Sequence, residues 1–297
     1  MSLSNERLVD FAKRSGVLDD PEVRKLVLAA GLSQSEFLQE SISKAVVGRS
    51  VQHFQYPFRS RFSSGNIVLG ENDQGLFRLQ EEDLMKHLLA VGQSGSGKTT
   101  LFYSLMDEVD KPFWAFDLKQ DYRHLIQSAD LLVLPWTQLK FNPLKPPEDV
   151  PPRRWAQVFS EVFGHATALL SGSKNYLMKK IIELYLLYDL FEEVSSPYPS
   201  LHELKLLIKK DSINFVRKTS DYRDTVLNRL EAMTLVSGTV FDCSQGHPVE
   251  ELLERDVVFE FDGLSRDVQN FLMELLFAYV YEYRISQNHR DTGLNHL

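Results

Sequence analysis

The sequence predicts an α/β fold with a mostly parallel sheet, preceded by a small helical segment, and three observations support this prediction. A glycine-rich motif at 92–100 is typical of a loop that joins a strand to a helix. After it, short apolar runs alternate with stretches of helical period, as in a doubly wound sheet with right-handed crossovers. Before residue 50 only helical periods occur. We therefore expect a helical appendage at 1–50, a linker with a β-hairpin at 51–80, and one α/β domain at 81–297.

The glycine-rich motif reads GQSGSGKTT and matches the phosphate-binding pattern GxxxxGK[ST] in full. Its glycines let the backbone approach a polyphosphate closely and adopt positive φ. Lys98 would place its charge beside the β and γ phosphates as a catalytic residue, and the Thr99 hydroxyl would ligate Mg²⁺. The sequence thus predicts ATP and Mg²⁺ as cofactors. The expected nucleotide-binding residues are Gly92, Ser94, Gly95, Ser96, Gly97, Lys98, Thr99 and Thr100.

The residues that flank this loop have the periods that the motif requires. The run 87–91, HLLAV, reads as a short buried strand. Apolar residues at 101, 102, 105 and 106 have helical spacing, so the loop opens a helix whose N-terminal dipole faces the phosphates.

Composition and charge narrow the class of protein. The chain has 297 residues, 43% of them hydrophobic, and a formal net charge of -8, which argues against a protein that coats nucleic acid with a uniformly basic surface. Cys243 is the single cysteine, so an intramolecular disulfide is excluded and a reducing, cytoplasmic setting is expected. We find no apolar run of about 18 residues and no signal peptide, and therefore expect a soluble protein with no membrane partner.

The first 80 residues carry no catalytic pattern. Asp20 before Pro21 predicts an N-cap, and a third helix is expected from Ser33 to about Val47, ending before Gly48. This segment reads as a docking or oligomerisation appendage. Residues 51–64 mix aromatic and basic side chains, which fits either a linker with buried aromatics or a surface that stacks on nucleic acid. Residues 66–69 and 76–79 then predict a hairpin that leads directly into the strand at 87–91.

Two acidic residues are expected at the carboxyl ends of strands. The run 112–117 predicts a strand that ends at Asp117, with Lys119 just after it, where ligands bind in open α/β sheets. The alternative is a helix-capping aspartate beside a solvated lysine. A second strand at 256–262 ends at Asp262. Asp262 is a tempting catalytic acid, but Gly263 follows it where a second acid is expected.

The rest of the chain is expected to form further elements around this sheet. A strand is predicted at 131–134, an ordered proline-rich loop at 136–152, helices at 155–163, 176–191, 201–208, 221–235 and 265–286, and the beginning of another strand at 293–297. Lysines gather near two of these helices, either on a solvated face or along a DNA channel. They are Lys174, Lys179, Lys180, Lys205, Lys209 and Lys210.

In four stretches the chain resembles the HerA/FtsK superfamily of hexameric DNA-pumping ATPases, most closely its HerA-like branch. These stretches are HLLAVGQSGSGKTTL at 87–101, FDLKQDY at 116–122, FNPL at 141–144 and VVFEFDGLSRDVQNFLMELLFAYVYEYR at 257–284. The resemblance spans about residues 65–297. It implies a RecA-like P-loop NTPase that forms a homo-hexamer and moves DNA, double-stranded and threaded through the ring pore, with a possible partner nuclease or effector protein.

The resemblance also bears on the catalytic residues. FDLKQDY is similar to the family's Asp-Pro-Lys-Gly strand end, so Asp117 and Lys119 carry over as catalytic candidates, although Leu118 and Gln120 stand where the family has proline and glycine. The family's Asp-Glu pair lies on the strand after the long helix. Here that strand would begin at about Leu294, and the pair would follow Leu297. This implies a fragment that binds ATP but hydrolyses it poorly. The alternative is an ATP-binding regulatory or assembly module of a defence or conjugation complex without translocation activity of its own.

Overall fold

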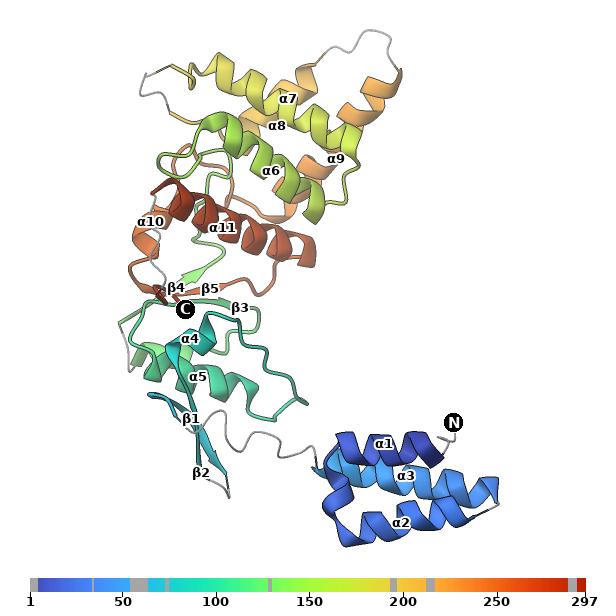
Figure 1. The fold of residues 1–297 in the computed structure, drawn as a ribbon. Helices are drawn as coiled ribbons and strands as arrows, with labels where there is room; N and C mark the ends of the chain where they lie inside the picture. Colours follow the sequence, from blue (N-terminus) through green and yellow to red (C-terminus); the bar gives the residue numbers. More distant parts are fainter. Residues whose placement is uncertain are drawn as a thin grey trace. The chain divides into compact units, whose positions relative to one another are not determined.

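The structure is a computed structural model that describes residues 5–33, 35–53, 64–72, 75–127, 130–192, 197–211, 217–287 and 293–297. The chain divides into two compact units, Met1–Leu89 and Ala90–Leu297. Each unit is described by itself below, and Figure 1 traces both.

The first unit begins with a helical module, as the sequence predicted. It comprises α1 (Asn5–Arg14), the short 3-10 helix η1 (Val17–Asp19), α2 (Pro21–Leu32) and α3 (Glu36–His53), which pack together in Figure 1. Its core is made of small and aliphatic side chains, namely Leu8, Ala12, Val17, Val23, Val27, Ala30, Ile42 and Val46.

The predicted end of the third helix before Gly48 is wrong, because α3 continues to His53. A glycine inside a helix costs only about 1 kcal/mol relative to alanine. The turn beyond it is held in place, since Ser50 is buried and its hydroxyl donates to the carbonyl of Val47. Packing therefore outweighs the local preference of Gly48.

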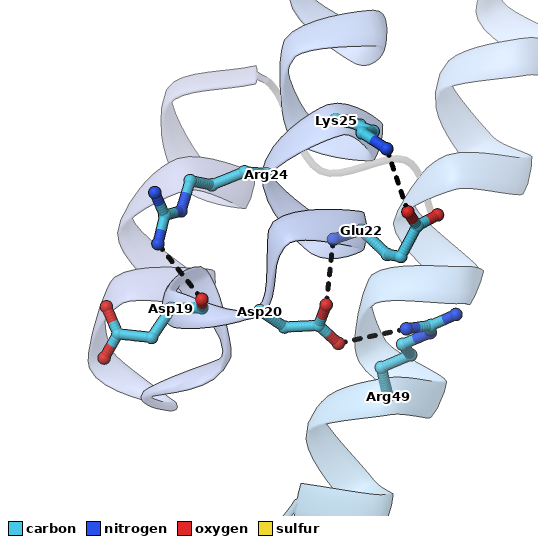
Figure 2. A network of polar contacts seen from close by, with 6 residues as sticks. All are labelled: Asp19, Asp20, Glu22, Arg24, Lys25 and Arg49. Atoms are coloured by element: carbon cyan, nitrogen blue, oxygen red, sulfur yellow. Dashed lines mark hydrogen bonds and ion pairs between the residues drawn. The ribbon is translucent and has the colours of Figure 1, made fainter.

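A polar network at the start of α2 joins α2 to α3 (Figure 2). The Asp20 carboxylate accepts from the amide of Glu22 at 2.8 Å and pairs with Arg49 of α3 at 3.0 Å. Asp20 is thus the N-cap that the sequence predicted, and it also fixes the neighbouring helix. Arg24 donates to the carbonyl of Asp19, which closes the turn before the helix.

We expect Asp20 to make the helical module sensitive to acid. The Glu22 amide and, after it, Arg49 hold the pKa of Asp20 below its usual range. A depressed pKa contributes stability above the unfolded pKa of about 3.9, and this contribution is lost as the pH falls through the lower folded pKa. The variant Asp20→Asn still caps the helix but cannot ionise. Thermal melts of the two proteins followed by circular dichroism should converge below about pH 4; melting curves that stay parallel at every pH would rule this role out.

The hairpin of the first unit also forms as predicted. Strand β1 (Ile67–Asn72) pairs antiparallel with β2 (Gly75–Leu79), with a register shift between Val68 and Gly70. It does not lead directly into the phosphate-binding segment, because the one-turn helix α4 (Glu81–Leu84) follows it. The Asp83 carboxylate accepts from the amide of Gln80, which forms a capping box that starts this helix.

The second unit is built on a parallel sheet with the order β3-β5-β4. The strands are β3 (Trp114–Asp117), β4 (Leu131–Pro135) and β5 (Asp256–Glu260). Residue 297 lies along the other edge of β3: Leu297 donates to the carbonyl of Pro112 and accepts from the amide of Trp114, both at 2.9 Å. This is the bonding pattern of a parallel ladder, as expected for the beginning of a strand at 293–297.

The predicted strand at 87–91 does not form, and this expectation is wrong for the structure described here. Those residues belong to neither described sheet, and Leu89 and Val91 are 86% and 80% exposed. His87 has a φ of 65°, a left-handed conformation that interrupts an extended run at its first residue. An apolar run becomes a strand only where a neighbouring strand pairs with its backbone, and the sequence pattern does not report that neighbour.

Helices cover both faces of the sheet. Helix α5 (Lys98–Glu108) lies on one face, where Met106 packs against a cluster that includes Ala115 and Val258. Helix α11 (Arg266–Ser286) lies on the other face, over Val257 and Phe259 (Figure 1). Neighbouring residues of β5 thus point to opposite faces, and both faces are buried, as in an α/β protein.

A helical lobe is inserted between β4 and β5. It consists of α6 (Pro152–Ala166), α7 (Ser171–Leu187), α8 (Leu201–Lys210) and α9 (Arg217–Val236), and the short α10 (Val249–Leu252) precedes β5. The proline-rich loop before α6 is ordered: the Asn142 side chain accepts from the amide of Leu144 and donates to the carbonyl of Ser244. Arg154 of α6 forms a two-pronged ion pair with the buried Glu282 of α11, at 2.6 and 3.0 Å. The lobe is therefore fastened to the helix that covers the sheet.

Candidate functional site: a phosphate-binding loop and the sheet edge beside it

The loop before α5 has the backbone geometry that a phosphate cradle needs. Gly95 and Gly97 have φ values of 79° and 87°, in the left-handed region that favours glycine. A Cβ at either position would meet no atom within 4 Å, so the space above them is open to a ligand. At Gly92 an added Cβ would lie 2.4 Å from the Ser96 hydroxyl oxygen, so the loop folds tightly there.

Lys98 is the first residue of α5, and it folds back over the loop. Its ammonium group donates to the carbonyls of Gly92 at 2.9 Å and Gln93 at 2.8 Å. These contacts hold a positive charge against the loop. Thr99 and Thr100 follow in the first turn of the helix, which contains no acidic residue to compete with an anion. The residues predicted to bind nucleotide are thus brought together in one loop and one helix start.

Asp117 lies at the carboxyl end of β3, where the sequence placed it. It is 2% exposed, and its carboxylate accepts from the amides of Lys119 at 2.9 Å and Tyr122 at 3.1 Å. This is the geometry expected of an aspartate that caps the backbone after it, because both oxygens bind backbone amides of the following loop. The Lys119 side chain is exposed. Catalytic roles for Asp117 and Lys119 stay predictions.

An ion pair that sequence reasoning missed joins this loop to the neighbouring strand. Arg123 donates through Nε and Nη2 to the two carboxylate oxygens of Glu260, at 2.6 and 2.7 Å. The Glu260 side chain is completely buried, whereas that of Arg123 is half exposed. Its hydrogen bonds to this carboxylate raise the pKa of Arg123. The signal that could have revealed it is the single acidic residue inside the apolar run VVFEF, since a buried charge needs a partner.

A second missed contact lies beside the first. The Gln120 side-chain amide donates to the Asp262 carboxylate at 2.6 Å, which connects the loop after β3 to the segment after β5. Gln120 has a φ of 63°, a conformation that costs a residue with a Cβ about 1 kcal/mol or more. Glycine adopts it freely. Asp262 therefore lies at the same edge of the sheet as Asp117. Its carboxylate is bound by a side chain, whereas that of Asp117 is bound by backbone amides.

The same loop is also fastened to the phosphate-binding helix. The hydroxyl of Tyr103, on α5, donates to the carbonyl of Asp121 at 2.6 Å. Its ring packs edge-on against Tyr122 and His124, with centroids 5.2 and 4.8 Å apart. Burial raises the pKa of Tyr122 to about 12, so its hydroxyl stays neutral. Residues 118–124 thus contact α5 on one side and the end of β5 on the other.

The lysines that suggested a DNA channel are partly engaged in other contacts. Lys180 is 12% exposed and pairs with Asp211 at 2.9 Å and with Glu183 at 2.8 Å. The aliphatic part of Lys174 lies against Gly164, where an added Cβ would be 2.3 Å from it. Lys179, Lys209 and Lys210 are exposed. The prediction of a basic and aromatic linker at 51–64 falls mostly on residues 54–63, which lie outside the described residues.

The described part of the chain contains no cluster of three or more histidine, cysteine, aspartate or glutamate side chains that could by itself hold a metal ion. Among its helices, none combines the length and the apolar character that crossing a membrane requires.

Comparison with known proteins identifies the fold. No protein-family model and no curated protein matches the chain. Among solved structures, that of VirB4 of Thermoanaerobacter pseudethanolicus is similar, with a TM-score of 0.56 and 15% sequence identity. The match covers 77% of this chain and 66% of the VirB4 chain. An identity this low establishes the fold alone. Together with the parallel sheet and the loop before α5, this structural similarity shows that the chain has the RecA-like fold of a P-loop NTPase.

Proposed function

We propose that this chain is the ATP-binding motor domain of a HerA/FtsK-like DNA translocase or helicase. In this proposal it works as a homo-hexamer that moves double-stranded DNA through its ring, with a nuclease or effector protein as a possible partner. The observation that carries the proposal is the loop at 92–97 with Lys98 at the start of α5. Its open glycines and its lysine would bind the β and γ phosphates, and the N-terminus of α5 would favour their charge.

A Mg²⁺ ion at this site would be held mainly by the phosphates of the bound nucleotide. Magnesium keeps several waters and takes one or two protein ligands together with substrate phosphates, so a dedicated cluster of carboxylates is not required. The Thr99 hydroxyl, half buried in the first turn of α5, is the ligand on this chain. The bound ion would supply charge neutralisation at the transferred phosphate. Lys98 would exchange its loop carbonyls for phosphate oxygens.

We expect the chain to bind ATP firmly and to hydrolyse it slowly. Asp117 and Glu260 are the acidic residues at the carboxyl ends of described strands, and both already have their two oxygens bound within the protein. Asp262, predicted to end its strand, lies two residues beyond the end of β5. Loss of a general base slows a reaction by about 10²-fold or more. A steady-state assay of phosphate release should therefore give a rate near background, and Asp262→Asn should not lower it. Rapid turnover that Asp262→Asn abolishes would assign the catalytic acid to Asp262 instead.

The alternative is an ATP-binding regulatory or assembly module of a defence or conjugation complex without translocation activity. One observation favours it: Lys180, a candidate for DNA contact, is largely shielded and forms ion pairs with Asp211 and Glu183. Such a lysine contributes to folding of the lobe and offers no free charge to a phosphate backbone.

DNA binding separates these two functions. For a translocase we expect the chain to bind double-stranded DNA at low salt, with the affinity falling as salt increases. The substitution pair Lys209→Glu and Lys210→Glu should weaken this binding, because both side chains are exposed. A chain that binds ATP but does not bind DNA would favour the regulatory module.

A further inference from the structure

We propose that Gln120 is a positioning residue that transmits the state of the nucleotide site to the segment after β5 by holding Asp262. This inference deepens the proposed function, and its nucleotide-dependent part rests on it. The residues involved form a continuous series of contacts within the second unit. The series runs from α5 through Tyr103 to the loop 118–122, and from Gln120 of that loop to Asp262.

The first step of the series links the phosphate-binding helix to the loop. Tyr103 lies on the helix that Lys98 begins, and its hydroxyl binds the carbonyl of Asp121 at 2.6 Å. Lys98 now binds two carbonyls of its own loop. A phosphate that takes over the lysine breaks both of these hydrogen bonds. A displacement of α5 that follows would reach Asp121 through the Tyr103 contact.

The second step depends on a difference between two contacts at the sheet edge. Arg123 and Glu260 form a bidentate pair with a fully buried carboxylate, which makes a fixed anchor for one end of the loop. Gln120 makes a single hydrogen bond to Asp262 from an exposed side chain and a left-handed backbone. The contact that can open and close is thus the one made by Gln120, while the anchor keeps the loop in place.

The strained backbone at Gln120 supports a role for its side chain. Backbone conformations that disfavour a Cβ persist where the residue provides something that glycine cannot. Here the side-chain amide reaches a carboxylate 142 residues away in the sequence. A glycine at this position would keep the loop conformation and lose the link to Asp262.

Hydrogen exchange measured by mass spectrometry tests this series of contacts. The probe is Mg²⁺ with an ATP analogue that is not hydrolysed, and the reporting segments are 118–122 and 261–265. In the unmodified chain we expect the probe to slow exchange several-fold in both segments. In Gln120→Gly, the probe should still slow exchange at 118–122 but no longer at 261–265. In Tyr103→Phe, the probe should still bind but should slow exchange in neither segment.

Controls separate this role from a loss of stability. Gln120→Gly and Gln120→Ala both remove the hydrogen bond, but only the glycine relieves the left-handed strain, so the glycine variant should melt at the higher temperature. Both should lose the response at 261–265 equally. A response that Gln120→Gly leaves intact, or one that never reaches 261–265 in the unmodified chain, would overturn the inference.

The same contacts can be tested without a nucleotide, which separates failure of this inference from failure of the proposed function. In the free chain, Tyr103→Phe should speed exchange at both segments, whereas in the Gln120→Gly background it should affect only 118–122. This pattern would support the series of contacts even if no nucleotide binds. Equal effects of Tyr103→Phe at 261–265 in the two backgrounds would contradict it.

Discussion

Lys98→Ala should weaken binding of ATP by about 100-fold or more, equivalent to ~2.7 kcal/mol. Lys98 is the one charged side chain in the motif GQSGSGKTT, and its ammonium group lies against the carbonyl of Gly92. A hydrogen bond to a charged group contributes about 1.5–3 kcal/mol, and Lys98 would make such bonds to both terminal phosphates. Equilibrium titration with a fluorescent ATP analogue measures the effect.

A matched control distinguishes this contact from a general effect of charge. Lys179→Ala removes the same charge from an exposed position on α7 and should leave the affinity unchanged. Lys98→Ala should also keep the melting temperature close to that of the unmodified chain, because the side chain braces only a surface loop. Equal affinities for Lys98→Ala and Lys179→Ala would show that the nucleotide binds elsewhere.

Arg123→Met should destabilise the second unit strongly, and more than Glu260→Gln. Removing the guanidinium leaves the Glu260 carboxylate fully buried without a counter-charge, which is the costlier way to break such a pair. Removing the carboxylate leaves Arg123 half exposed, so water replaces its partner. Urea denaturation followed by tryptophan emission compares the midpoints, because Trp114, Trp136 and Trp155 all lie in the second unit.

The double variant Arg123→Met with Glu260→Gln completes this comparison. It should recover part of the stability that Arg123→Met loses, because no charge is then buried. Two results would contradict this account of the ion pair. One is a larger loss of stability from Glu260→Gln than from Arg123→Met. The other is a loss in the double variant that equals the sum of the two single losses.

The sequence predicted those parts of the site that a local pattern determines. The motif at 92–100 specifies a backbone conformation within nine residues, and the glycines at 95 and 97 have the positive φ that it requires. The strand that ends at Asp117 and the N-cap at Asp20 are equally local. Each depends on residues that are close in the sequence, where propensity and hydrogen bonding act together.

The contacts that the sequence did not predict join residues far apart in the chain. Arg123 and Glu260 are separated by 137 residues, and only the folded sheet brings the ends of β3 and β5 together. The expected strand at 87–91 failed for a related reason, because pairing with a neighbouring strand decides it. The φ of 63° at Gln120 is a left-handed conformation that the sequence pattern did not predict.

Titration of the chain with ATP in the presence and absence of Mg²⁺ tests the central claim most directly. We predict saturable binding of one nucleotide per chain that Mg²⁺ strengthens and that ADP inhibits far better than AMP, because the loop binds the distal phosphates. An absence of binding, or inhibition by AMP as strong as that by ADP, would contradict the assignment of residues 92–100 as the nucleotide site.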